Sequence, residues 1–134
     1  MSGERILILE DNPDLEQRLL DVLGELGYEP TPIYAKDECA DAARNAGAIA
    51  ILLDADADPE GAFGLWASLR GQCTWLYTVL MGASETLARA RKSIPEPSAP
   101  DCYLAKPFAP RLLKKILAGR PDRGGPPQAS VPAP

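Results

Sequence analysis

Short apolar runs alternate along the chain with longer segments in which apolar residues recur at helical spacing. Five runs have the length and composition of buried β-strands. They cover residues 5–9, 31–35, 48–53, 75–81 and 102–105. A segment of helical period follows each run, which predicts five helices. These cover residues 13–26, residues 36–46, a stretch carrying Leu65, Trp66 and Leu69, residues 85–93, and a last segment from Pro110 to Leu117.

Turn and cap residues set the boundaries of these elements. Asn12 can cap the first helix with Pro13 in its first position, and Gly47 provides a left-handed stop for the second. A loop through Gly61 is expected before the third helix, and Ser84 is a candidate cap for the fourth. The strict alternation of strands and helices predicts a doubly wound α/β fold, a parallel sheet with helices on both faces.

Length and composition fit a single domain. The chain has 134 residues, of which 46% are hydrophobic, enough for one sizeable core. We assign residues 1–118 to this domain. Residues 119–134 are rich in proline and glycine, which predicts a flexible tail.

Charge and residue usage exclude several classes of function. The net charge of -5 offers no basic footprint, so neither direct nucleic-acid binding nor membrane association is expected. The absence of histidine excludes Ser-His-Asp and Cys-His catalysis. The three cysteines are far apart, without a CxxC pair, and no secretory or membrane-spanning segment stands out. A cytoplasmic protein with reduced thiols is predicted.

Charged residues stand at the carboxyl ends of several predicted strands. Glu10 and Asp11 follow the first strand, Asp54 follows the third, and Lys106 with Pro107 follows the fifth. Each signal alone has a simpler interpretation, since acids often cap helices and a Lys-Pro pair can be a turn. Because parallel strands present their carboxyl ends at one edge of the sheet, we expect these groups to meet. Such a set of carboxylates suits a hard divalent ion such as Mg²⁺.

Four motifs occur in a fixed order over about residues 4–118: "ILILEDNPDL", "AILLDADAD", "LMGAS" and "YLAKPF". Together they resemble the receiver domain of two-component response regulators, including the chemotaxis regulators. The resemblance implies a flavodoxin-like fold with strand order 2-1-3-4-5. It also implies that a sensor histidine kinase or a histidine phosphotransfer protein donates a phosphoryl group to Asp54. The domain would then be a signalling protein rather than an enzyme, beyond catalysing its own phosphorylation and dephosphorylation.

The same resemblance implies roles for individual residues. Mg²⁺ would be held by Glu10, Asp11 and Asp54, with Asp56 adding its backbone carbonyl. Lys106 would pair with Asp54 and then with the phosphoryl oxygens. Physically, a metaphosphate-like transition state needs mainly alignment and cationic stabilisation, which Mg²⁺ and Lys106 can supply.

The switch residues depart from the family pattern. Tyr103 matches the aromatic switch position, but Gly82, followed by Ala83, stands where the family has Thr or Ser. A lost hydrogen bond to a charged group is worth roughly 1.5 to 3 kcal/mol, unless Ser84 replaces it. Asp58 stands where proline is common, and its charge would oppose an incoming phosphoryl group. In the family, the fourth helix, fifth strand and fifth helix bind a downstream effector or a second copy in a homodimer.

Two alternatives remain open at this point. A pseudo-receiver would keep the fold and the acids as an interaction module that works without phosphorylation, which Gly82 favours. "DADAD" also satisfies the DxD motif of haloacid-dehalogenase-type phosphohydrolases, with Asp54 as nucleophile and Asp56 as acid. That motif belongs near the first strand of a longer chain, and no acidic metal motif follows Lys106.

Overall fold

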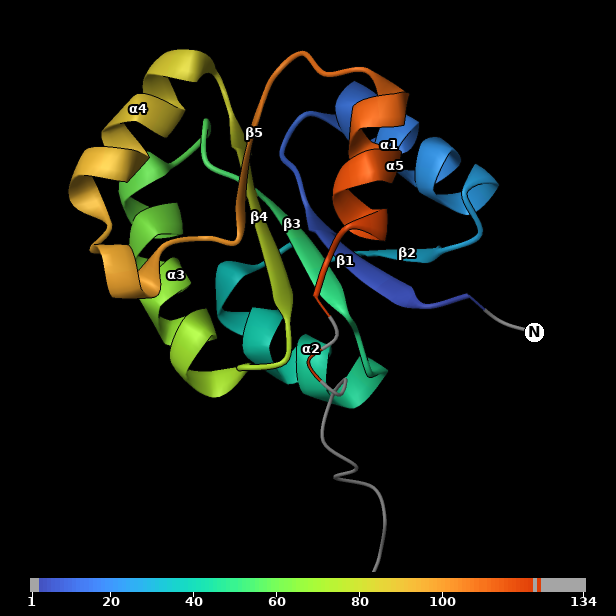
Figure 1. The fold of residues 1–134 in the computed structure, drawn as a ribbon, viewed down its shortest axis with the longest axis horizontal. Helices are drawn as coiled ribbons and strands as arrows, with labels where there is room; N and C mark the ends of the chain where they lie inside the picture. The colour runs from blue at the N-terminus through green and yellow to red at the C-terminus, as the bar shows by residue number, and fades with distance from the viewer. Residues whose placement is uncertain (1–2, 122, 124–134) are drawn as a thin grey trace, which may run out of the picture.

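The computed structural model describes residues 3–121 and residue 123 (Figure 1). Strands and α-helices alternate through this part of the chain, with two short 3-10 helices, η1 and η2, between them. In chain order the elements are β1 (Arg5–Leu9), α1 (Pro13–Glu25), β2 (Glu29–Pro32), η1 (Lys36–Glu38), α2 (Cys39–Ala46), β3 (Ala50–Asp54), α3 (Pro59–Gln72), β4 (Tyr77–Gly82), α4 (Ser84–Ser93), η2 (Glu96–Ser98), β5 (Cys102–Ala105) and α5 (Pro110–Ala118).

The strands form one parallel sheet in the order β2-β1-β3-β4-β5. This arrangement confirms the predicted fold class and strand order. The register aligns the carboxyl ends of the central strands: Leu9 pairs with Leu53, Asp54 with Met81, and Gly82 with Ala105. The loops that follow β1, β3, β4 and β5 therefore share one edge of the sheet.

Alternate residues of each strand enter two separate cores, one on each face of the sheet. Helices α1 and α5 cover one face, where Ile8, Leu52 and Met81 pack under Leu19 and Leu113. The other face is covered by α2, α3 and α4. Its core is built around Leu7, Ile51, Leu53, Leu80, Trp66 and Leu87. Figure 1 shows α1 and α5 side by side on one side of the sheet and the other three helices opposite.

The predicted second strand, residues 31–35, was placed too late. In the structure β2 spans Glu29–Pro32, and its register begins with Glu29 opposite Arg5. The observed strand contains two prolines, Pro30 and Pro32. They are tolerated because β2 is at the edge of the sheet, where one side of the strand needs no hydrogen-bonding partner.

Other predicted boundaries are also corrected. Strands 48–53 and 75–81 were predicted to begin two residues too early and end one residue too early, and the helix predicted over 36–46 begins as η1. Gly61 lies inside α3, because Asp58 caps that helix and Pro59 is its first residue. Ser84 is within α4 rather than its cap, a position taken by Ala83 without a side-chain bond. The Asn12 cap on α1 is confirmed by its hydrogen bonds to two backbone N–H groups.

Residues beyond α5 remain attached to the domain as far as they are described. Arg120 pairs with Glu4, with 2.6 Å between Nη2 and Oε1, and Arg123 pairs with Asp101 at 2.6 Å. Of the tail predicted over 119–134, residue 122 and residues 124–134 lie outside the described part. No helix in the part described has the length and apolar character needed to cross a membrane.

Candidate functional site

Three carboxylates surround one ammonium group at the carboxyl edge of the sheet. Lys106 Nζ lies 2.7 Å from Asp54 Oδ1, 2.9 Å from Glu10 Oε1 and 3.6 Å from Asp56 Oδ2. Strand β1 ends just before Glu10, β3 ends at Asp54, and β5 ends just before Lys106, so the parallel register brings them together. The predicted meeting of these residues is what the structure shows.

Because the cluster is buried, its excess of carboxylates over ammonium groups lowers the stability of the folded protein. The side chains of Glu10 and Asp54 are only 1% and 3% exposed, and that of Lys106 is 17% exposed. Burial raises the pKa of Glu10, with a smaller contribution from Asp54, even though Lys106 and the N–H of Asn12 oppose it. Burial alone would lower the pKa of Lys106, but its contacts with Asp54 and Glu10 outweigh burial and raise it. The ammonium is therefore held in its charged form.

The two oxygens of Asp54 differ in their surroundings. Oδ1 accepts hydrogen bonds from Lys106 Nζ at 2.7 Å and from the backbone N–H of Asp56 at 3.1 Å. No described residue donates to Oδ2. One oxygen is thus oriented by two donors, and the other is left for a bond outside the protein.

The side chain of Asp56 crosses from the β3–α3 loop to the start of α4. Its carboxylate accepts from the backbone N–H of Ala83, with N···O distances of 2.9 and 3.2 Å. Burial tends to raise the pKa of Asp56, but the hydrogen bonds from Ala83 and Thr86 and the charge of Lys106 hold it below its ordinary value. Asp56 is thereby fixed as an anion beside Asp54.

Gly82 is the residue that leaves space for this carboxylate. A Cβ built on Gly82 would lie 3.0 Å from Asp56 Oδ1 and 3.4 Å from Thr86 Cβ. From the sequence, Gly82 was interpreted as a lost hydroxyl, and Asp56 as a backbone ligand of Mg²⁺ or, in the phosphohydrolase alternative, as the acid. The signal that could have revealed the contact was the pairing of an acid two residues after Asp54 with a glycine at the end of the neighbouring strand.

Asp11, a predicted metal ligand, and Asp58, the predicted departure from the family pattern, are not among the acids that pair with Lys106. Asp11 is exposed at the mouth of the β1–α1 loop. Asp58 turns toward α3, where its Oδ1 accepts from the N–H of Gly61 at 3.1 Å, and its Oδ2 lies 3.5 Å from Lys36 Nζ. The charge of Asp58 is therefore neutralised outside the cluster, so it opposes an anion on Asp54 less than its position in the sequence suggested.

Tyr103, the predicted aromatic switch residue, is half-buried on β5. The guanidinium of Arg91, from α4, stacks over its ring with Cζ 4.2 Å from the ring centre. Such a cation–π contact is worth roughly 0.5 to 1 kcal/mol where solvent is near. Tyr103 is consequently tied to α4, a contact that the sequence analysis did not predict.

The oxygen ligands of this cluster suit a hard divalent cation. Glu10 Oε1 is buried and accepts no hydrogen bond from the described residues, although it forms an ion pair with Lys106. Within residues 3–121 and 123, no group of three or more His, Cys, Asp or Glu is arranged to hold a metal ion. Mg²⁺ needs only one or two carboxylates because it keeps several waters. Glu10 and Asp54 fit that requirement, and Asp11 is exposed directly after Glu10 in the chain.

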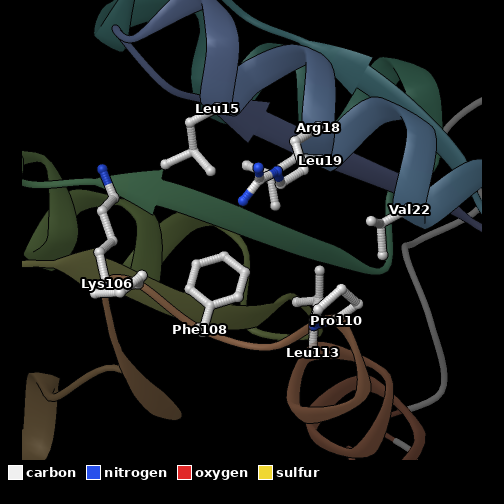
Figure 2. A pocket seen from close by; sticks show the side chains of 9 residues that line it. Leu15, Arg18, Leu19, Val22, Lys106, Phe108, Pro110 and Leu113 are labelled. Atoms are coloured by element: carbon white, nitrogen blue, oxygen red, sulfur yellow. The ribbon is translucent and has the colours of Figure 1, made fainter.

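An apolar groove of about 300 Å³ opens beside Lys106, between α1 and the start of α5. Figure 2 shows Leu15, Leu19 and Val22 of α1 on one wall, facing Phe108, Pro110 and Leu113. Arg18 also lines the groove and is exposed. The Lys106–Pro107 peptide bond at its end is cis. The groove thus adjoins the charged cluster.

Comparison with known proteins adds a shared fold to this geometry. No protein-family model and no curated protein matches the sequence. Among solved structures, the chemotaxis protein CheY4 of Vibrio cholerae is similar over 87% of this chain and 98% of its own, with 21% identity and a TM-score of 0.70. The receiver domain of the response regulator TorR matches over 87% of this chain and 94% of its own, with 22% identity and a TM-score of 0.73.

A third similar structure is the receiver domain of the sensor histidine kinase PA1611 from Pseudomonas aeruginosa, which contains a magnesium ion in its active-site cleft. It covers 87% of this chain and 95% of its own, with 24% identity and a TM-score of 0.72. At these identities the similarity concerns the fold. The expectation drawn from the four ordered motifs is confirmed at that level: the chain has the fold of response-regulator receiver domains.

Proposed function

We propose that this protein is a phosphoacceptor receiver, in which Asp54 takes a phosphoryl group from the phosphohistidine of a partner. The observation that supports this most directly is the position of Asp54. It is buried at the carboxyl edge of the sheet, with Oδ1 held by Lys106 Nζ at 2.7 Å and with no described donor to Oδ2. An oriented carboxylate beside a charged lysine is the arrangement that in-line phosphoryl transfer requires.

In the proposed reaction, Asp54 Oδ2 forms a bond to phosphorus as the P–N bond to the partner's imidazole breaks. The electron pair of the broken bond returns to the imidazole nitrogen, so this chain needs no histidine of its own. Lys106 follows the negative charge that develops on the transferred oxygens, because its ammonium is already 2.7 Å from Asp54. When Mg²⁺ is bound, it would neutralise further charge on the phosphoryl oxygens.

The residues proposed to hold that Mg²⁺ are Glu10 and Asp54, with Asp11 and the backbone carbonyl of Asp56 completing the site as the sequence predicts. The burial of the Glu10 carboxylate, whose side chain is 1% exposed, beside Asp54 supports this assignment. The three cysteines are free thiols, two of them buried, in keeping with the proposed cytoplasmic location.

The groove beside Lys106 is the proposed contact for the phosphodonor. Its apolar walls, formed by residues such as Leu15 and Phe108, adjoin the acceptor site, so a kinase or phosphotransfer helix seated there would bring its phosphohistidine to Asp54. The α4–β5–α5 face remains the predicted surface for a downstream effector or for a second copy in a homodimer.

The test is intact-mass analysis after incubation with Mg²⁺ and acetyl phosphate, for the wild type and Asp54→Ala. We expect the wild type to gain one phosphoryl group that is stable in acid and labile in base, and Asp54→Ala to gain none. Asp58→Asn is the matched control, because it removes a charge from the same loop but outside the cluster. Failure of the wild type to take label, under conditions that label a control receiver, contradicts the proposal.

A second candidate is a pseudo-receiver that keeps the fold as an interaction module without phosphorylation. The observation that favours it is that Asp56 already occupies the N–H of Ala83. The labelling experiment separates the two, since a pseudo-receiver takes no phosphoryl group. The phosphohydrolase alternative lacks a comparable observation, because Asp56, its required acid, is engaged as an anion at Ala83.

A further inference from the structure

The carboxylate of Asp56 engages two donors at the carboxyl edge of the sheet, where Asp54 also lies. It accepts from the N–H of Ala83 at 2.9 and 3.2 Å, and its Oδ2 lies 3.6 Å from the ammonium of Lys106. That same ammonium is 2.7 Å from Asp54. A phosphoryl group on Asp54 therefore meets a second anion already placed at both donors.

Backbone geometry keeps these donors close to Asp54. In the β3–β4 pairing Asp54 stands opposite Met81, and the N–H of Ala55 bonds to the carbonyl of Met81 at 2.9 Å. Ala83 follows two residues after Met81. The carboxylate of Asp56 can reach it because Gly82 carries no side chain, and a Cβ there would lie 3.0 Å from Asp56 Oδ1.

Two negative groups so close together compete for the same positive charge. Their repulsion is strong because Asp54 and Lys106 are largely removed from water. The effective dielectric constant inside the protein is lower than in water, so charges there interact more strongly. The side chain of Asp56 is itself 35% exposed, so it has a route into solvent when displaced.

We propose that Asp56 is an internal anion that holds Ala83 N–H and faces Lys106 in the unmodified protein, and that it must leave before a phosphoryl group on Asp54 can use them. This inference rests on the proposed phosphoacceptor function and assigns a built-in restraint to it. Asp56 is a positioning residue in this scheme, and Gly82 permits its position. Because Asp56 opposes it, transfer of a phosphoryl group to Asp54 is less favourable. The β4–α4 junction already binds an anion, so exchanging Asp56 for a phosphoryl group changes its conformation little.

The contact itself is tested without phosphorylation, by following the amide proton of Ala83 by NMR in the metal-free protein. In Asp56→Ala we expect this resonance to move upfield and its hydrogen exchange to accelerate. Gly82→Ala should shift it in the same direction by crowding the carboxylate. Asp58→Asn should leave it unchanged. An Ala83 resonance that does not respond to Asp56→Ala overturns the inference.

The restraint is tested by titrating the wild type and Asp56→Ala with beryllofluoride, a phosphoryl mimic, in the presence of Mg²⁺. Removing one repelling charge and freeing two donors should tighten binding about tenfold or more, the equivalent of at least about 1.4 kcal/mol. Asp56→Ala should also reach a higher level of labelling with acetyl phosphate. Asp58→Asn, which lies outside the cluster, should resemble the wild type in both measurements.

The outcomes separate this inference from the proposed function. If neither protein binds beryllofluoride or takes label, the phosphoacceptor function fails, and the restraint fails with it. If both bind and are labelled equally well, the function stands and the restraint alone is overturned. Stronger binding or labelling of Asp56→Ala than of a wild type that is itself labelled supports both. Labelling of Asp56→Ala alone contradicts the phosphoacceptor function of the wild type and supports only the restraint.

Discussion

The sheet carries a carboxylate that is largely removed from solvent at each end of its strands, Asp101 at the amino ends and Asp54 at the carboxyl ends, and their partners differ in charge balance. At the amino ends of the strands, Asp101 accepts from the N–H and hydroxyl of Thr78 and forms ion pairs with Arg70 at 3.2 Å and Arg123 at 2.6 Å. At the carboxyl ends, Asp54 and its neighbouring acids share the single ammonium of Lys106.

The pKa directions express this difference. Burial would raise the pKa of Asp101, but hydrogen bonds from Arg123 and Thr78 outweigh it and hold the pKa below its ordinary value. Burial prevails at Glu10, whose pKa is raised. The amino-end cluster therefore stabilises the fold, whereas the carboxyl-end cluster holds charge at a cost, as sites for cations and reacting anions do. Substitutions at the two edges should have opposite effects on stability.

The largest expected effect is at the amino end. Asp101→Asn should lower the free energy of unfolding by about 2 kcal/mol, because it weakens the hydrogen bonds from Thr78 and removes the charge that pairs with the partly exposed guanidinium groups of Arg70 and Arg123. Since the folded pKa of Asp101 is depressed, its contribution is fully present above the unfolded value near 3.8 and is lost as the pH falls through the folded value. Urea unfolding at pH 7 and below pH 3.8 measures both, and an unchanged midpoint at pH 7 would remove the distinction between the edges.

At the carboxyl end, Glu10→Gln should act in the opposite direction. A raised folded pKa means that ionised Glu10 opposes folding, and this loss of stability develops as the pH rises from 4.5 through the folded value. The neutral variant should therefore be more stable than the wild type at pH 7 by about 1 kcal/mol without Mg²⁺. The gain should vanish below pH 4.5. A destabilised variant at pH 7 would show that the Lys106 pair dominates there.

The smallest expected effect concerns the contact between Arg91 of α4 and Tyr103 of β5, which belongs to neither charged cluster. Arg91→Ala removes the guanidinium from the face of Tyr103 and should lower the free energy of unfolding by roughly 0.5 to 1 kcal/mol. Arg91→Lys keeps the charge but loses the planar group, so it should recover only part of the difference. Thermal unfolding of the three proteins measures the contact, with Arg89→Ala on the same helix as the control.

The sequence predicted those features that follow from periodicity and from strand ends. Alternating apolar runs predicted the parallel sheet, and that topology brought Glu10, Asp54 and Lys106 together as expected. Side-chain direction was beyond this reasoning: the acid at position 56 and the glycine at position 82 only permit the contact with Ala83, and the pattern does not distinguish Asp56 from Asp58, which turns away to cap α3. The contact depends on the close approach of two loops, which only the three-dimensional structure describes.

Two further differences between the predicted and the observed structure concern the outermost strand β2 and the acid Asp101 that precedes β5. A strand with two prolines does not look like a strand until its place at the border of the sheet is known, so β2 was predicted two residues late. Asp101 was missed because an acid before a strand has no distinctive pattern. Its partners Arg70 and Arg123 are separated from it by 31 and 22 residues.

The two indole rings give the protein its own optical reporter. Trp66 is fully buried and its Nε1 has no hydrogen-bonding partner among the described residues, while Trp75 donates to the carbonyl of Ala48 at 2.9 Å. Both belong to the core under α2, α3 and α4. Emission from the native state should be blue-shifted and should shift to longer wavelength on unfolding, so fluorescence can follow the stability of every variant without a label.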